Sequence, residues 1–399
     1  MSSSMPMTVA WNSGVQEEFM RNRTRLRLAT LLMCIVSAAT SSAPAQHDQR
    51  VQLKLDSSEA DQVLVILDVR AGGKPIAEEQ WQKLFATEPY QRLKVREAAI
   101  AKRFNAPENV LKDEDFKKFV LSDDLLKRST ELGTTLARWK KIDMQQTGLR
   151  VLEYLPASAV IRATIYPVIK ANINSFVWET STNPAIFLYL DPDVSAPKFE
   201  NTVAHELHHI GLASSLADYE KRIEALPERP RAVAEALEAF GEGFAMLAAS
   251  GGPDVDPHAA SSAQEHARWD HDMANFDRDL QAVNTFFVDV LNGKFASHDA
   301  IEEKASSFYG VQGPWYTVGY KMAVMVEKRF GREELIKTML DPRRLLVLYN
   351  QSAVEQNAAG KEQLPLWSDE VLKQVNATAK SGDVRDTTHS PRPCDGQVN

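Results

Sequence analysis

The sequence predicts an α+β fold in which helices predominate. Apolar residues recur at helical spacing from Glu78 to Lys141, and the pattern is again mostly helical from Phe199 to Val375. Short apolar runs at Val151–Tyr154, Ala159–Ile165 and Ala185–Leu190 have instead the length and composition of strands. These observations together indicate a small sheet among many helices.

Two further segments complete the predicted layout. Gln52–Ile66 has the pattern of a strand followed by a helix, and Ile169–Trp178 alternates as a strand does. We therefore divide the chain into an N-terminal helical portion, residues 46–150, and a second portion, residues 151–375, which holds most of the sheet and the remaining helices. Residues 376–399 are rich in Gly, Pro, Asp and Thr, and we expect them to be a disordered tail.

The composition is that of a globular protein. The chain has 399 residues, of which 44% are hydrophobic and 25% charged, with a net charge of −8. This length is enough for one large or two smaller domains with a sizeable core. The sequence contains no basic stripe, so we do not expect a nucleic acid partner.

The N-terminus has the features of a secretory signal. Arginine occupies alternate positions in Arg21–Arg27, an apolar stretch follows at Leu28–Ala39, and a small-residue site ends at Ala45. We expect residues 1–45 to be removed, with Met20 as the true start. The apolar stretch is too short to cross a bilayer as a helix. The prediction is thus a periplasmic or extracellular protein with no stable membrane span after signal removal.

Cysteine usage agrees with a chain that has no internal disulfide. Cys34 lies in the apolar stretch of the signal and leaves with it, so Cys394 is the single cysteine of the mature chain.

The most informative motif is His205-Glu206-Leu207-His208-His209, which reads H-E-x-x-H. On an α-helix, residues four apart lie on the same face, so His205 and His209 can offer two imidazole nitrogens to one Zn²⁺. In such sites the glutamate acts as general base, which assigns that role to Glu206. A histidine-rich surface helix that binds no metal is the alternative.

The surroundings of the motif favour the metal site. The buried strand predicted at Ala185–Leu190 precedes it, and Ser195 can cap a helix that tolerates Pro197 in its first turn. That helix is expected to run from about Pro197 to Leu216.

A catalytic zinc ion usually has a third protein ligand, which must come from another element. The next predicted helix, from about Pro230 to Ala249, carries Glu235, Glu238 and Glu242. Glycines flank Glu242, and each costs about 1 kcal/mol in a helix interior, which suggests the close approach of another backbone. We therefore expect Glu242 to be the third ligand, and Glu235 and Glu238 to be solvated.

Other candidates rank below these residues. Glu228 lies between two prolines that disfavour a continuous helix, so we place it below Glu242 as a ligand. His208 is expected in a supporting or surface position. Four further histidines are expected to be solvated: His258, His266, His271 and His298.

The chain resembles the gluzincins, zincin peptidases whose third zinc ligand is Glu. The resemblance rests on H-E-x-x-H and on Glu242-Gly243-Phe244-Ala245. The sequence is more similar still to bacterial zinc-dependent peptidases known mainly as a domain of unknown function. That similarity extends over Gly313–Tyr320, Phe330–Arg332 and Leu340–Pro342, and to Trp81 and Tyr90.

The resemblance implies a zincin-like catalytic portion at residues 151–375, with a small sheet beside the zinc helix. It also implies that a tyrosine or a histidine stabilises the oxyanion. Tyr316, three residues before Gly319, is the first candidate, and Tyr320 ranks below it; the alternative is that both rings pack in the core.

The predicted function is hydrolysis of peptide bonds in peptides or proteins by a single Zn²⁺. The alternative is a secreted zinc-binding or ligand-binding protein that has the fold without the activity. An intact Glu206 favours the enzyme, because a site that only binds metal needs no base. The substrate, the cleavage specificity, the oligomeric state and the preference for zinc over other metals do not follow from the sequence.

Overall fold

The computed structural model describes residues 49–103, 110–172, 175–179, 182–360 and 362–374. The predicted signal, the predicted tail, Cys34 and Cys394 lie outside these ranges. The chain forms two compact units, the first made of Met1–Ser215 and Ala245–Ala267, the second of Leu216–Phe244 and Arg268–Asn399.

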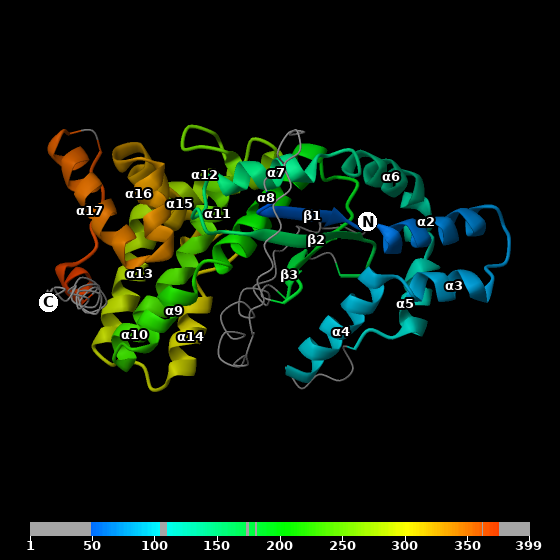
Figure 1. The fold of residues 1–399 in the computed structure, drawn as a ribbon, viewed down its shortest axis with the longest axis horizontal. Helices are drawn as coiled ribbons and strands as arrows, with labels where there is room; N and C mark the ends of the chain where they lie inside the picture. The colour runs from blue at the N-terminus through cyan, green and yellow to red at the C-terminus, as the bar shows by residue number, and fades with distance from the viewer. Residues whose placement is uncertain (1–48, 104–109, 173–174, 180–181, 361, 375–399) are drawn as a thin grey trace, which may run out of the picture. The chain divides into compact units, whose positions relative to one another are not determined.

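The first unit is built on a four-stranded sheet (Figure 1). Its strands are β1 (Val51–Leu55), β2 (Ile161–Val168), β3 (Phe176–Trp178) and β4 (Ala185–Tyr189), in the order β1-β2-β4-β3. The pairs β1·β2 and β2·β4 are parallel, whereas β3 runs antiparallel to β4. The predicted small sheet is thus confirmed, including the strand expected at Ala185–Leu190.

Helices α7 (Met144–Leu152) and α8 (Ala196–Ala213) cover one face of the sheet. A Cβ added at Gly148 of α7 would lie 2.5 Å from Val51 Cγ1, and one at Gly211 of α8 would lie 3.1 Å from Ile161 Cγ1. Val51 and Ile161 are register partners on neighbouring parallel strands, so both helices pack against the same face of the sheet. Glycine at these two positions lets the helices approach the strands closely.

The strand expected at Val151–Tyr154 is wrong. Val151 and Leu152 form the last turn of α7, and the two residues that follow lie beyond it. The helix begins because the Asp143 side chain accepts hydrogen bonds from the backbone N–H groups of Gln145 and Gln146. The apolar run is the buried end of this helix, and it is too short to distinguish from a strand by its pattern.

The opposite face of the sheet packs against helix α4 (Glu88–Arg103). Leu93 of α4 joins Tyr166, Val168, Phe176 and Phe187 in one buried cluster. Because side chains alternate along a strand, Tyr166 and Val168 point away from the face that carries Ile161. Buried residues on both faces explain the nearly continuous apolar sequence of β2.

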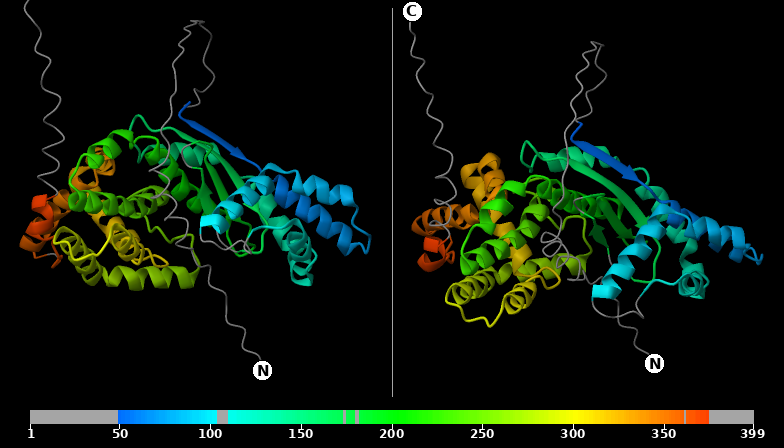
Figure 2. Two further views of the ribbon diagram at one scale, coloured as in Figure 1. Left: turned by 90° about the horizontal axis from the view of Figure 1, so that it is seen from below. Right: turned by 60° about the horizontal axis from the view of Figure 1, so that its bottom comes forward.

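The remaining helices of the N-terminal half confirm the helical pattern expected from Glu78 to Lys141, and the helix expected after β1 (Figure 2). They are α2 (Ser58–Ala71), α3 (Glu78–Phe85), α5 (Asp113–Val120) and α6 (Asp123–Trp139).

All regular elements in the described residues of the second unit are helices, as expected from the sequence after Phe199. Its central helix, α15 (Pro314–Phe330), contacts α13, α16 and α17. Trp315 at the start of α15 lies 5.0 Å from Phe240 and 6.2 Å from Phe287, measured between ring centroids. The helices after α8 are α9 (Ala217–Glu224), α10 (Glu228–Leu237), the 3₁₀ helix η3 (Glu238–Phe240), α11 (Gly241–Ser250), α12 (Ala263–Ala274), α13 (Phe276–Leu291), α14 (His298–Ser306), α16 (Arg332–Leu340) and α17 (Arg343–Ala358).

The helix expected as one piece from Pro230 to Ala249 is divided by η3, and it begins earlier, at Glu228. The two prolines do not prevent this start. Pro227 is the N-cap, and Pro230 lies in the first turn, where a missing N–H removes no intrahelical hydrogen bond.

The predicted fold class, α+β with mostly helices, is therefore confirmed. No described helix is both long enough and apolar enough to cross a membrane.

Candidate metal centre

Helix α8 begins at the position that the sequence predicts. The Ser195 side chain accepts a hydrogen bond of 3.2 Å from the Lys198 backbone N–H, and Pro197 lies in the first turn. The helix ends at Ala213, three residues before the expected end, where the Ser214 hydroxyl donates to the Gly211 carbonyl. His205 and His209 thus lie well inside a regular helix.

The two imidazoles converge on one point. Their Nε2 atoms lie 3.1 Å apart, with ring centroids 4.8 Å apart and ring planes at 76°. Two nitrogens bound to one tetrahedral zinc ion at 2.0–2.1 Å lie about 3.3 Å apart. A direct hydrogen bond between one protonated and one unprotonated nitrogen fits the same distance. The geometry therefore suits a shared metal ion without requiring one.

Glu206 and His208, the other polar residues of the motif, are both buried. Glu206 is 6% exposed, so its carboxylate is largely withdrawn from bulk solvent. His208 is fully buried, which excludes the surface position that the sequence left open for it. The structure thus leaves His208 a supporting position within the core.

Glu242, on the first turn of α11, is also buried. The next residue, Gly243, touches α15: a Cβ there would lie 2.1 Å from the backbone nitrogen of Tyr320 and 2.2 Å from the carbonyl carbon of Gly319. The close backbone approach expected from the two glycines is therefore confirmed, but at Gly243 alone. A Cβ at Gly241 would meet nothing within 4 Å.

His205, His209 and Glu242 form a group that could hold a metal ion, since one ligand atom of each lies within 4.8 Å of the others. Within the described part of the chain, no other His, Cys, Asp or Glu residues form such a group of three. Glu228, which the sequence ranked lower, is not included. Two nitrogens and one carboxylate oxygen are a donor set that zinc accepts.

Glu235 and Glu238 are not the fully solvated charges that the sequence suggested. Both are half-buried. Burial raises the pKa of Glu235, and Arg231 one turn earlier lies 3.8 Å from its carboxylate. Neither glutamate belongs to the candidate metal group.

Tyr316 and Tyr320 are both buried on α15. The Tyr320 ring packs edge-on against Trp269, with centroids 5.3 Å apart. Packing thus accounts for the Tyr320 ring, while the oxyanion role of Tyr316 stays a prediction.

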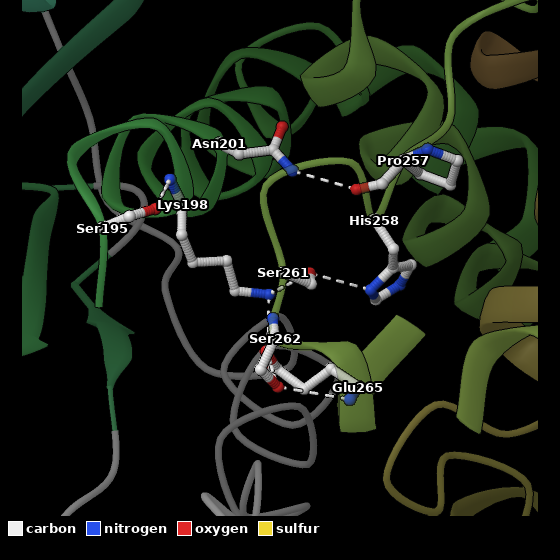
Figure 3. A network of polar contacts seen from close by, with 8 residues as sticks. All are labelled: Ser195, Lys198, Asn201, Pro257, His258, Ser261, Ser262 and Glu265. Carbon is white, nitrogen blue, oxygen red and sulfur yellow. Dashed lines mark hydrogen bonds and ion pairs between the residues drawn. The ribbon is translucent and has the colours of Figure 1, made fainter. Parts of the chain in front are cut away.

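A network of polar contacts around Ser261 connects the first turns of α8 to the loop between α11 and α12 (Figure 3). Lys198 Nζ donates to Ser261 Oγ at 2.9 Å and lies 3.4 Å from the Glu265 carboxylate. His258 Nδ1 is 2.9 Å from the same hydroxyl, and the Asn201 amide donates to the Pro257 carbonyl at 3.2 Å. This network lies within the first unit.

The expectation that His258 is solvated is wrong. The side chain is 2% exposed, and burial together with nearby Lys198 lowers its pKa to about 4. The neighbours of His258 in this loop, Ser261 and Pro257, are bonded to α8, about 60 residues earlier in the chain, so no local pattern indicates the burial. The expected solvation of His266 and His298 is closer to the structure, since each is partly exposed, with its Nε2 atom 2.9 Å from the Asp256 carboxylate and 3.3 Å from the Glu302 carboxylate respectively.

Comparison with known proteins gives one match. A family model described as "Putative zinc dependent peptidase (DUF5700)" matches residues 81–358, a range that contains every predicted site residue. No curated protein and no solved structure matches the chain.

Proposed function

The chain belongs to this family of putative zinc dependent peptidases, and from that premise we propose that it hydrolyses peptide bonds with one zinc ion held by His205, His209 and Glu242. The observation that carries the proposal is the convergence of the imidazoles of buried His205 and half-buried His209, whose Nε2 atoms lie 3.1 Å apart on one helical face. The nearby Glu242 carboxylate completes the donor set.

The donor set fits a catalytic zinc ion better than a structural one. Structural zinc sites are usually closed by four Cys or His ligands, whereas three ligands leave a position open. A zinc ion held by two imidazoles and a carboxylate supplies a Lewis acid that acidifies water and polarises the scissile carbonyl.

The chain's own groups then move the protons. Glu206 follows His205 directly and is not in the metal group, so we assign it the role of general base. Its carboxylate takes a proton from the attacking water and passes it to the amine that leaves. The Tyr316 hydroxyl is assigned to donate a hydrogen bond to the carbonyl oxygen as that oxygen gains negative charge.

The replacement Glu206→Gln tests whether Glu206 acts as the base and not as a zinc ligand. The amide keeps the shape of the side chain but cannot accept the proton, so the variant should retain zinc and lose hydrolysis by about 10²–10⁴-fold. Glu200→Gln is a matched control, because Glu200 lies on the same helix and contacts Thr147 and Arg150 instead. It should retain both zinc and activity.

The substrate for this assay comes from screening unfolded proteins and mixed peptides with the unaltered protein. Zinc bound at one ion per chain without cleavage of any of them would favour the alternative, a zinc-binding protein without activity. Cleavage by Glu206→Gln at the full rate would refute the assignment of the base.

We also propose that the protein is exported and acts in the periplasm or outside the cell on peptides or proteins. The signal features of residues 1–45 support this proposal. N-terminal sequencing of the exported protein should begin at Gln46. Recovery of the protein only from the cytoplasm, with residues 1–45 uncleaved, would contradict it.

A further inference from the structure

The two proposed zinc-binding histidines share one side of α8 with two residues that bind a loop. Lys198, Asn201, His205 and His209 follow one another at intervals of three or four residues, so they lie along one side of the helix. Lys198 and Asn201 bind the loop of residues 251–262 that follows α11, which we call the anchoring loop (Figure 3). His205 comes four residues after Asn201, a rise of about 6 Å along the helix. The anchoring loop therefore contacts α8 about one turn from the first proposed ligand.

The other sides of these first turns have different partners. Phe199 stacks on Trp139 of α6, with ring centroids 4.1 Å apart. The Glu200 carboxylate lies 3.1 Å from the Arg150 guanidinium of α7. These contacts dock α8 against α6 and α7, whereas the contacts of Lys198 connect α8 to the segment that follows α11.

The anchoring loop is closely tied to the end of α11. This helix ends at Ser250, whose hydroxyl oxygen lies 2.8 Å from the Leu247 carbonyl oxygen and 3.2 Å from that of Gly252. Near the other end of the loop, the Ser261 N–H donates to the His258 carbonyl at 2.8 Å. The loop is thus a series of bonded turns, and a displacement of Ser261 is passed on to the end of α11.

The start of α11 carries the proposed third ligand. The helix is ten residues long, about 15 Å, and Glu242 lies in its first turn. At this end Gly243 packs against the backbone of Tyr320. A helix of this length is stiff, so the position of the Glu242 carboxylate depends on what holds both ends.

Lys198 makes the strongest contact between α8 and the anchoring loop. Its ammonium donates to the Ser261 hydroxyl at 2.9 Å and lies 3.4 Å from the Glu265 carboxylate, with the side chain 17% exposed. His258 is neutral at neutral pH, since its pKa is lowered to about 4, so the same hydroxyl can donate to His258 Nδ1 at 2.9 Å. Hydrogen bonds from a charged donor are stronger than those between neutral groups. Removal of Lys198 should therefore release the loop more than the loss of the neutral Asn201 bond.

We propose that Lys198 is a positioning residue for the zinc site. By holding the anchoring loop through Ser261, it keeps α11 in the place from which the Glu242 carboxylate reaches the ion. The inference rests on the proposed function, because it assumes that Glu242 is the third zinc ligand.

The main test is zinc titration of Lys198→Met against a chelator of known affinity. The variant should bind zinc about tenfold more weakly, which is the lower end of the effect of residues that support metal ligands. Ser261→Ala removes the acceptor of the same bond and should cause a similar loss, with little further loss when both changes are combined. Glu200→Met is the matched control, because it removes a polar contact of the same turn with α7; its zinc affinity should be unchanged.

A double-mutant cycle distinguishes the positioning of Glu242 from a general weakening of α8. In Glu242→Ala the third ligand is absent, so adding Lys198→Met should weaken zinc binding by less than about twofold. A general effect on α8 would act through the two histidines and would persist in this background. Amide hydrogen exchange at Ser261 should also be faster in Lys198→Met, because the anchoring loop is released.

Three results would overturn the inference and leave the proposed function intact. They are unchanged zinc affinity in both Lys198→Met and Ser261→Ala, a full loss when Lys198→Met is added to Glu242→Ala, and unchanged exchange at Ser261. Zinc affinity in Glu242→Ala equal to that of the unaltered protein would instead refute the ligand assignment, and the inference with it. If Lys198→Met fails to fold, Ser261→Ala, alone and combined with Glu242→Ala, decides the question.

Discussion

Adding a single methyl group at Gly243 should separate α11 from α15. The Cβ of Gly243→Ala would lie 2.1 Å from the Tyr320 backbone nitrogen, whereas ordinary contact begins at 3.4 Å, so the helices must move apart by more than about 1 Å. The obstacle is backbone, which cannot rotate away as a side chain can.

The net cost follows from two opposing effects. Overpacking of a tight interior costs about 1–3 kcal/mol, and a clash with backbone belongs at the upper end. Alanine improves helix propensity by about 1 kcal/mol. Gly243→Ala should therefore lower the free energy of unfolding by about 2 kcal/mol. Because Glu242 is the adjacent residue, the variant should also bind zinc about tenfold or more weakly.

Gly241→Ala is the matched control on the same helix. A Cβ there meets nothing within 4 Å, so the variant should be as stable as the unaltered protein or more stable by up to about 1 kcal/mol. The assay is urea unfolding of the metal-free proteins, followed by zinc titration against a chelator of known affinity. Equal unfolding midpoints for the two variants would refute the proposed helix contact.

Three further predictions concern other residues. Glu242→Gln should weaken zinc binding while Glu238→Gln does not; the opposite result in metal analysis would move the third ligand back along the chain. Lys198→Met should raise the pKa of His258 above about 4, because the nearby Lys198 charge is one cause of the lowered pKa. The control Lys221→Met, which changes an exposed lysine, should leave this pKa unchanged. An NMR titration in which the His258 pKa is the same in Lys198→Met as in the unaltered protein would contradict the prediction. Glu59 is fully buried, and burial raises its pKa from 4.5 to about 8, so the folded protein keeps a proton that the unfolded chain loses in this range. Stability from this group is therefore lost as pH rises from about 4.5 to 8. Between pH 5 and pH 8, the free energy of unfolding of the unaltered protein should fall relative to that of Glu59→Gln. A difference in unfolding free energy between the two proteins that stays constant over this range would exclude the effect.

The parts of the fold that depend on neighbouring residues could be predicted from the sequence. Helix α8 follows a short apolar strand, and its start is set by Ser195 and Pro197, all within a few residues of one another. The spacing of His205 and His209 then places both imidazoles on one face. The glycine next to Glu242 correctly indicated the contact with a second backbone.

The features that sequence reasoning missed depend on distant contacts. The 3₁₀ turn between α10 and α11 lies where Gly319 of α15 packs against the Phe240 carbonyl. His258 is buried because Lys198 and Asn201 of α8 hold its loop in place. In α7, Val151 and Leu152 look like part of a strand until the cap at Asp143 is recognised.

The most direct test of the central claim is a diffraction experiment at the zinc absorption edge on crystals of the purified protein. The account predicts one anomalous peak per chain, at about 2.0–2.2 Å from His205 Nε2, His209 Nε2 and a Glu242 carboxylate oxygen. A peak on other residues, or a hydrogen bond between the two imidazoles with no peak after the crystals are soaked in zinc, would contradict it.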